Sequence, residues 1–329
     1  MELGWSEEMP FEAGIQSTID WYIKYNNKTC DRERILVYGA HGWIGGQFLQ
    51  LLDDKGINYL KGKSRIGEDS DKVVENEILE AAPTHVASFI GRTHGPGNNT
   101  IDYLEGGPDK LTINLRDNLF GPLVLAEICK KHYIHFTYIG SGCLFTYTDE
   151  HPPGSAPFTE DDVPNYFGSS YSVVKGFTDR LMHHHDNVLN IRMRLPVSND
   201  VNPRNLITKL ATYPKIMSIP NSVTVLPELL PALLELMKKR HTGTVNLVNH
   251  DSIEHTEILS EYIKLVDSSH TYELVGMNEP SEFARSLKKK RSNCHLDTTV
   301  LGELCPQVSS SKDAVMKAIK EMSVRTGKQ

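Results

Sequence analysis

Short apolar runs alternate with amphipathic stretches along most of the chain. β-Branched and aromatic residues predict strands at 34–38, 57–60, 84–90, 134–139, 188–195 and 244–248. Between them, apolar residues spaced three and four apart predict helices at 47–54, 118–132, 170–184, 256–265 and 312–322, with one more that ends before Pro83. Strands that alternate with helices form parallel sheets with right-handed crossovers. The pattern therefore predicts an α/β fold with a doubly wound parallel sheet.

The segment 196–231 breaks this pattern, because it is rich in Pro and Asn and has few periodic runs. In open α/β folds, ligands bind among the loops beyond the carboxyl ends of the strands. We therefore expect this segment to belong to a smaller substrate-binding lobe that is interleaved with the sheet.

The first 30 residues look separate from this body. Apolar residues at helical spacing occur at 11–15 and 18–22, and polar residues at 26–29 are typical of a linker. A single short helix is not stable alone. It must therefore dock on the body, pair with another chain, or be the remnant of a larger unit.

Composition and charge narrow the class of protein. The 329 residues are 39% hydrophobic and 23% charged, which is typical of a globular protein. The net charge of −7 argues against a general nucleic-acid binder, because such proteins need a basic face. No run of about 18 apolar residues predicts a membrane span, and the acidic N-terminus does not resemble a secretory signal. We therefore expect a cytoplasmic protein with no nucleic-acid partner and no membrane partner.

The five cysteines are Cys30, Cys129, Cys143, Cys294 and Cys305. An odd number without a CxxC pair argues against a zinc site and against a disulfide framework. We therefore expect reduced thiols and no bound metal.

Three glycines separate the first predicted strand from the first predicted helix. Gly39, Gly42 and Gly45 would permit a tight turn, let a pyrophosphate approach the backbone, and let the helix pack close to the strand. The helix N-terminus then faces the phosphates. This context favours a dinucleotide-binding Rossmann fold over a purely structural turn. The same turn would place three further residues against the cofactor: His41, Trp43 and Ile44.

The residues after the second strand indicate which cofactor binds. Lys63, Ser64 and Arg65 follow that strand, and no acidic residue appears before Glu68. An acid at this place usually binds the ribose 2′-hydroxyl of NADH, whereas an arginine suits the 2′-phosphate of NADPH. We expect NADPH, with NADH as the alternative; without a ligand, these residues form a solvated basic loop.

The cofactor site suggests how the chain is divided. We expect a tail and linker at 1–30 and an NADP-binding Rossmann domain at 31–196. The remainder, 197–329, is expected to form mainly the substrate-binding lobe, with a return to the sheet near 244–248.

A Tyr-x-x-x-Lys pattern lies in the helix predicted at 170–184. The spacing of four puts Tyr171 and Lys175 on one helix face. A tyrosine pKa near 10 suits proton exchange at neutral pH only if a nearby ammonium favours the phenolate. Ser141, at the end of the strand predicted at 134–139, would hydrogen-bond a substrate carbonyl. Together with the glycine turn, this pattern predicts ketone reduction.

These motifs resemble those of the extended short-chain dehydrogenases/reductases, with Asn118 matching as well. Three longer tracts, 142–145, 200–209 and 220–226, are similar to nucleotide-rhamnose synthase/epimerase-reductases and their kin, the dTDP-4-dehydrorhamnose reductases. The resemblance covers roughly 34–266. It implies further cofactor contacts at Gly91, Thr93, Asn118 and Pro196.

The resemblance implies reduction of the C4 ketone of a nucleotide-diphosphate (NDP) 4-keto-6-deoxy sugar to NDP-L-rhamnose. Tyr171 would donate the proton, Ser141 would orient the carbonyl, and Lys175 would also hold the ribose. In bifunctional members a cysteine and a lysine first perform 3,5-epimerisation, and these match Cys143 and Lys209. Cys143 as an apolar filler and Lys209 as a solvated residue remain the alternatives. The residues implied to line the sugar-nucleotide pocket are Cys143, Asn202, Arg204, Asn205 and Asn221.

Other interpretations of the sequence remain open. The chain could be a reductase that works beside a separate epimerase, or a regulatory subunit that resembles the methionine adenosyltransferase β subunit. A 4,6-dehydratase is disfavoured because the region 141–143 has no acidic residue. The first 26 residues resemble the C-terminus of such a dehydratase, so a homodimer and an association with a 4,6-dehydratase both remain open. The sequence does not choose between UDP and dTDP.

Two charged runs are expected to be solvated. The three histidines at 183–185 lie at a helix end, where consecutive side chains point in different directions. The basic run 288–291 is expected to form a solvated face.

Overall fold

A computed structural model of the chain describes residues 10–11, 13–19, 33–276 and 279–327. Its centre is a six-stranded parallel sheet in the order β2-β1-β3-β4-β5-β9. The strands are β1 (Ile35–Tyr38), β2 (Tyr59–Lys61), β3 (His85–Ser88), β4 (His135–Ile139), β5 (Val188–Arg192) and β9 (Gly243–Asn246). The doubly wound α/β fold is thereby confirmed. The strand order reverses between β1 and β3, and ligands bind at such a switch point.

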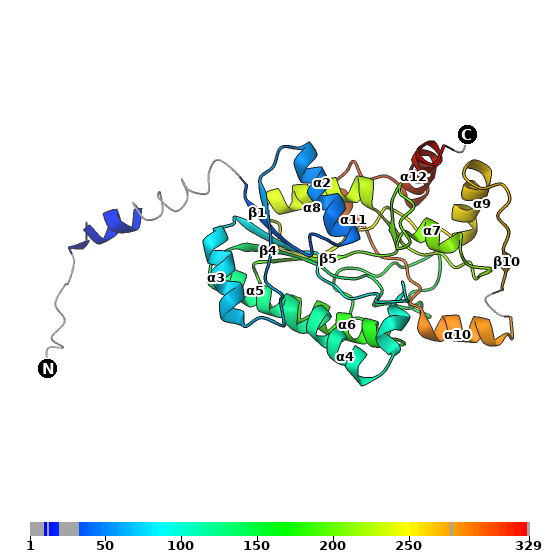
Figure 1. Ribbon diagram of the computed structural model, residues 1–329, viewed down its shortest axis with the longest axis horizontal. Helices are drawn as coiled ribbons and strands as arrows, with labels where there is room; N and C mark the ends of the chain where they lie inside the picture. Colours follow the sequence, from blue (N-terminus) through cyan, green and yellow to red (C-terminus); the bar gives the residue numbers. More distant parts are fainter. Residues whose placement is uncertain (1–9, 12, 20–32, 277–278, 328–329) are drawn as a thin grey trace.

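The apolar residues of β1 show why this sheet is covered on both faces. Ile35 and Val37 join one core, whereas Leu36 and Tyr38 join another. The first core also receives α2 (Trp43–Asp54), α8 (Leu226–Lys238) and α11 (Thr299–Leu304). The second receives α3 (Asp71–Ala81), α5 (Gly121–Lys131) and α6 (Ser170–Met182). Figure 1 shows these two helical layers on opposite sides of the sheet.

A separate apolar core lies beyond the carboxyl ends of the strands. It is built by α7 (Leu206–Leu210), α9 (His255–Leu265) and α12 (Ser311–Arg325). Two small parallel sheets flank it and pair β6 (Pro196–Val197) with β8 (Thr224–Val225), and β7 (Lys215–Ile216) with β10 (Glu273–Leu274). Helix α10 (Glu282–Lys290) follows at the same end (Figure 1).

The expectation that 196–231 has few regular elements was wrong at its C-terminal end. Helix α8 begins at Leu226 and contains Pro231 in its interior. A proline there removes one helical hydrogen bond. The helix forms nevertheless because most of its apolar side chains are buried against the sheet, including Leu229, Leu233 and Leu236.

A helical region lies between β3 and β4. It begins with η1 (Ile101–Glu105) and, after Gly106 and Gly107, continues without a break through α4 (Pro108–Leu115), the π-helical turn η2 (Arg116–Phe120) and α5. The helix predicted from Asn118 therefore begins earlier than expected. A π-turn often marks a functional position, and this one contains Asn118.

The N-terminal segment is helical over 13–19 and is drawn apart from the body in Figure 1. Two of its apolar residues, Ile15 and Ile19, are 44% and 42% exposed. The predicted linker at 26–29 and the residues 20–22 lie outside the described residues. Over the residues that are described, no helix is both long and apolar enough to cross a lipid bilayer.

Candidate active site

The glycine turn between β1 and α2 brings backbone close to backbone. Gly39 has a φ of +74°, and a Cβ on it would lie 2.6 Å from the carbonyl carbon of Phe89. A Cβ on Gly45 would collide with the Gly39 carbonyl oxygen. Gly42 precedes α2 and donates its N–H to Gly39 at 3.0 Å. The first-turn N–H groups of α2 therefore point toward the switch point, where they can bind phosphate.

Three further residues of this turn were predicted to contact the cofactor, and each has a different environment in the structure. Trp43 donates its indole N–H to the Asp200 carboxylate at 2.8 Å, so it ties the turn to the loop before α7. Ile44 packs against the core under α2, and His41 is exposed. The turn thus connects the cofactor side of the fold with the loops beyond the sheet.

The loop after β2 is anchored by a carboxylate from α3. Glu77 accepts the backbone N–H of Lys63 at 2.6 Å and that of Ser64 at 2.9 Å. The side chain of Arg65 is 79% exposed and pairs with Glu68 at 3.2 Å. The cationic side chains of Lys63 and Arg65 therefore lie where a 2′-phosphate is expected. Glu77 fixes the backbone that carries them.

Ser141 and Tyr171 meet at the exit of β4. Ser141 follows the strand and accepts the N–H of Cys143 at 3.0 Å. Tyr171 comes from the first turn of α6, and both residues are buried. Burial and the nearby Cys143 raise the pKa of Tyr171, while a hydrogen bond with Ser141 acts in the opposite direction. The phenol therefore keeps its proton at neutral pH, and the expected lowering of its pKa by a nearby ammonium does not offset this rise.

Lys175 lies one turn further along α6 and is only 3% exposed. Its ammonium donates to the Tyr138 hydroxyl at 2.7 Å and to the Ile139 carbonyl at 3.4 Å. Burial lowers the pKa of Lys175 to about 7, although Asp179 acts to raise it. The nearest hydrogen-bond partner of this ammonium is thus Tyr138 of β4, which the sequence motif does not include.

The pKa of Lys175 leads to a prediction about cofactor binding. One pH unit above that value the amine is mostly neutral, and an anionic dinucleotide favours the ammonium. We expect NADPH binding at that pH to take up a substantial fraction of a proton, up to about one. Calorimetric titration in buffers of different ionisation enthalpy measures this uptake. Lys175→Met should abolish it, and equal uptake by that variant would assign the proton to another group.

Asn118 joins the β3 exit to α6 from inside the π-turn. Its side chain accepts the N–H of Arg92 at 3.0 Å and donates to the Arg92 carbonyl at 2.9 Å. The backbone carbonyl of Asn118 accepts a hydrogen bond from the Thr178 hydroxyl of α6 at 2.6 Å. A Cβ on Gly91 would lie 3.4 Å from the Asn118 amide oxygen and 3.8 Å from the Lys175 ammonium. Asn118, Gly91 and Lys175 are therefore brought together. Thr93 is nearby in the chain and contacts His94 at 3.3 Å.

A cationic cluster faces Cys143 from the loops beyond the sheet. Burial lowers the pKa of Lys209, with Arg291 and Arg204 acting in the same direction and Cys143 in the opposite one. His94 also has a lowered pKa, first through burial and then through Arg204, Arg92 and Lys209. These couplings show that Cys143 and Lys209, which are far apart in the sequence, share one environment. Cys143 is partly exposed there, unlike the buried cysteines.

Arg291 corrects the expectation of a fully solvated basic run. It forms two parallel hydrogen bonds with Asp102 of η1, at 2.6 and 2.9 Å. It also influences the pKa values of Tyr213, Tyr166 and Lys209. Arg291 therefore belongs to the cationic cluster.

Three predicted pocket asparagines hold the backbone together. Asn205 is fully buried and caps α7, and its amide group donates to two carbonyls of its own loop. Asn221 is buried and accepts from Arg194 and from the N–H of Cys294. Asn202 accepts the N–H of Arg204 at 3.0 Å. These contacts shape the loops that carry Arg204, and Pro196 opens the same region in β6.

Reasoning from the sequence missed Tyr138, Glu77 and Arg291. Tyr138 could have been suspected from the inward-facing positions of β4, because a buried tyrosine hydroxyl needs a partner. Glu77 and Arg291 had no local signal, since each acts on residues that are distant in the chain. Only the folded structure brings them to the site.

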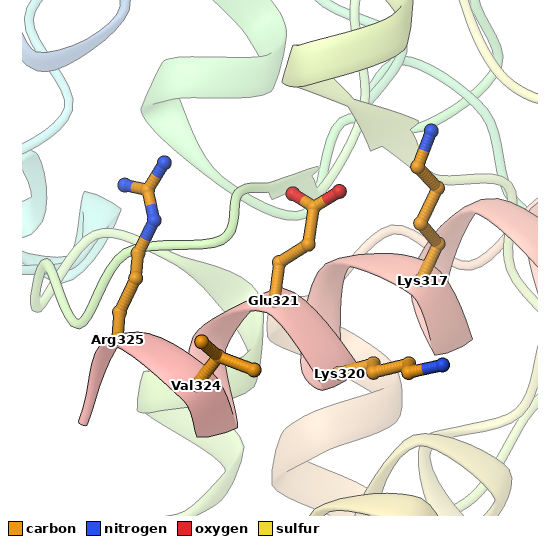
Figure 2. Close-up of a pocket in the computed structure, with 5 residues that line it drawn as sticks. All are labelled: Lys317, Lys320, Glu321, Val324 and Arg325. Atoms are coloured by element: carbon orange, nitrogen blue, oxygen red, sulfur yellow. The ribbon is translucent and has the colours of Figure 1, made fainter. Parts of the chain in front are cut away.

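Other candidate sites are weaker. Figure 2 shows a surface hollow on α12, lined by Lys317, Lys320, Glu321, Val324 and Arg325. All of these come from one helix, and none is a predicted site residue. Across the described part of the chain, no group of three or more histidine, cysteine, aspartate or glutamate side chains is arranged to hold a metal ion. The described cysteines carry free thiols, and Cys30 lies outside the described residues.

Comparison with known proteins agrees with this geometry. No protein-family model matches the chain. The L780 protein of Acanthamoeba polyphaga mimivirus is 45% identical over 288 residues, which cover 87% of this chain and 98% of that protein. The crystal structure titled as the L780 UDP-rhamnose synthase of that virus superposes with a TM-score of 0.82 at 42% identity, covering 88% of this chain and 100% of the other.

Plant proteins are similar as well. The bifunctional dTDP-4-dehydrorhamnose 3,5-epimerase/dTDP-4-dehydrorhamnose reductase of Arabidopsis thaliana is 36% identical over 303 residues, covering 92% of this chain and 97% of that protein. The chain spans about half, 54%, of the length of one trifunctional Arabidopsis relative, to which it is 32% identical. The chain therefore belongs to the dTDP-4-dehydrorhamnose reductase and rhamnose synthase family of extended short-chain dehydrogenases/reductases.

Proposed function

We propose that the chain catalyses the epimerase and reductase steps of NDP-L-rhamnose synthesis. The substrate is an NDP-4-keto-6-deoxy sugar, which is epimerised at C3 and C5 and then reduced at the C4 ketone. One observation carries this proposal: the Ser141–Tyr171 pair adjoins Cys143, and Cys143 shares its environment with Lys209. We thus assign a proton donor for the ketone and two proton carriers for its neighbouring carbons to one region of the fold.

In the reduction, bound NADPH supplies the hydride. The glycine turn and the α2 N-terminus are suited to its pyrophosphate, and the Lys63 and Arg65 side chains to its 2′-phosphate. Ser64, also predicted to bind the cofactor, instead donates its N–H to Glu77. NADH, which lacks the 2′-phosphate, is the alternative cofactor. Ser141 orients the ketone oxygen, and Tyr171 donates a proton to it as the alcohol forms. Lys175 holds the ribose side of the site while Tyr138 fixes its ammonium.

The epimerisation depends on the acidity of hydrogens beside a ketone. The C4 carbonyl acidifies the hydrogens at C3 and C5, so a base removes each proton and an acid returns it to the other face. Cys143 and Lys209 are the residues assigned to this exchange. Burial lowers the pKa of Lys209, which makes its neutral amine more accessible as a base.

The diphosphate of the substrate requires cations, and Arg204 and Arg291 supply them. A guanidinium matches phosphate oxygens through its planar fork. We expect Arg291→Ala to weaken UDP and dTDP binding by about ten- to a hundredfold, since the hydrogen-bonded charge pair between Arg291 and the diphosphate is lost. Calorimetry with UDP alone measures this effect. Arg285→Ala, an exposed change on α10, is the matched control. Unchanged affinity in Arg291→Ala would place the diphosphate elsewhere.

The test of the proposed function is product analysis. The chain is incubated with NADPH and with either UDP- or dTDP-linked 4-keto-6-deoxyglucose, and the products are identified by mass spectrometry and NMR. Formation of NDP-L-rhamnose from either ketone supports the proposal and identifies the nucleotide. Turnover of an epimerised ketone alone would indicate a reductase that needs a separate epimerase. No turnover of any such ketone would favour a regulatory subunit.

Location and assembly are part of the same proposal. We expect a cytoplasmic enzyme, since its substrates are nucleotide sugars. Three exposed apolar side chains on η2 and α6 are consistent with a homodimer, one of the two associations left open by the sequence: Phe120, Phe177 and Leu181, with exposed fractions of 56%, 59% and 40%. An association with a 4,6-dehydratase remains a prediction from the tail.

A further inference from the structure

The loop after β2, residues 62–65, is held by carboxylates of the chain itself. Glu77 of α3 uses one oxygen for the Lys63 N–H and the other for the Ser64 N–H, at 2.6 and 2.9 Å. The next N–H, that of Arg65, donates to the Asp69 carboxylate at 2.7 Å. Successive backbone N–H groups often form an anion-binding nest. Here these three groups are already paired, so they are not available to a cofactor phosphate.

Glu77 accepts a third donor as well. Besides the two N–H groups, its carboxylate accepts the Tyr38 hydroxyl of β1 at 3.1 Å. Burial acts to raise the pKa of this carboxyl, but the hydrogen bonds outweigh burial and lower it. A carboxylate offers about four acceptor positions. Three of them accept the Lys63 N–H, the Ser64 N–H and the Tyr38 hydroxyl. Glu77 is therefore occupied by the chain itself, unlike the acid that selects NADH by binding the ribose 2′-hydroxyl.

The side chains of the loop remain for the ligand. Within the described residues, the Lys63 ammonium makes no ion pair, and the Arg65 guanidinium is exposed with Glu68 as its partner. Gly62 donates its N–H to the Val37 carbonyl of β1 at 2.9 Å, which fixes the start of the loop. Only the two cationic side chains can meet a 2′-phosphate, and their positions depend on the backbone that Glu77 holds.

We propose that Glu77 is a positioning residue for cofactor selection: by fixing residues 62–65, it holds Lys63 and Arg65 where they bind the 2′-phosphate of NADPH. The inference rests on the proposed function in that it takes NADPH as the cofactor. It adds a residue outside the cofactor motifs that acts through the loop 62–65.

The test measures cofactor binding without any sugar. Dissociation constants for NADPH and NADH are determined by calorimetry for the wild type and for Glu77→Gln, which keeps the shape but loses one acceptor oxygen. We expect NADPH binding to weaken by about tenfold and NADH binding to change by less than about twofold, because only a phosphate uses the two cations. Glu77→Asp keeps both oxygens on a shorter stem and should show a smaller loss with the same selectivity. Glu80→Gln, an exposed change on the same helix, should alter neither constant.

A combined variant separates positioning from a general structural effect. Lys63→Ala with Arg65→Ala removes the cations and should itself reduce the preference for NADPH. If Glu77 acts through them, adding Glu77→Gln to this pair leaves the NADPH-to-NADH ratio unchanged. Equal weakening of both cofactors by Glu77→Gln, tighter NADPH binding, or additive effects in the triple variant would each overturn the inference. A wild type that binds neither cofactor would instead refute the proposed function.

Discussion

Replacing Tyr171 with phenylalanine is expected to lower kcat for ketone reduction by about a hundred- to ten-thousandfold, the usual contribution of a positioned proton donor. The phenol lies near Ser141 at the β4 exit, where it is buried and has a raised pKa. Phenylalanine retains the ring and removes only the hydroxyl, so the packing of α6 on the sheet should persist. The measurement is NADPH consumption with the epimerised 4-keto sugar, at saturating cofactor.

We expect Tyr171→Phe to affect the chemical step and not the binding of the cofactor. NADPH affinity should change by less than about twofold, because the cofactor contacts assigned to the glycine turn and the β2 exit are untouched. Tyr262→Phe, a change on α9 away from this site, is the control and should leave kcat unchanged. A Tyr171→Phe enzyme that turns over normally would show that another group protonates the C4 oxygen.

Replacing Cys143 or Lys209 with alanine is expected to abolish epimerisation while reduction survives. Each variant should lower proton exchange at C3 or C5 by about a hundred- to ten-thousandfold. Reduction of a ketone that has already been epimerised should stay within a few-fold of wild type, since Ser141 and Tyr171 remain. The measurement is deuterium incorporation from heavy water at C3 and C5, followed by NMR of the reduced product.

Matched variants test whether the positions matter rather than the residue types. Cys294→Ala removes a fully buried thiol whose sulfur lies 3.5 Å from the Gly142 carbonyl oxygen. Lys215→Ala removes an exposed lysine that pairs with Glu273. Both should incorporate deuterium as the wild type does. If Cys143→Ala and Lys209→Ala form L-rhamnose product normally from the unepimerised ketone, the epimerase assignment is wrong. In that case Cys143 is an apolar filler and Lys209 a solvated residue.

The predictions that succeeded from the sequence depended on local patterns. In β1, the alternation of Ile35 and Val37 with Leu36 and Tyr38 sends side chains to two faces, and the chain carries that signal within four residues. The glycine turn and the Tyr171–Lys175 spacing are equally local. Helix α8 was missed because Pro227 and Pro231 resemble loop residues, and only burial against the sheet compensates for them.

The arrangement of the site depended on contacts between distant residues. Asp102 and Arg291 are 189 residues apart, and the Lys175 ammonium finds Tyr138 37 residues away. Asn205 and Asn221 resemble pocket residues in the sequence, yet the structure uses both to satisfy buried backbone groups. Such assignments depend on which polar atoms are removed from water together, and no local pattern records that.

By itself, the sequence determined the order of strands and helices along the chain, the glycine turn between β1 and α2, and the placement of Tyr171 and Lys175 one turn apart on α6. These follow from side-chain periodicity and backbone freedom over a few residues. The tertiary structure alone decided which charges meet at Cys143, which asparagines face inward, and that Glu77 holds the loop of Lys63. The physical reason is burial: a polar group removed from water must find a partner, and only the completed fold determines which partner is within reach.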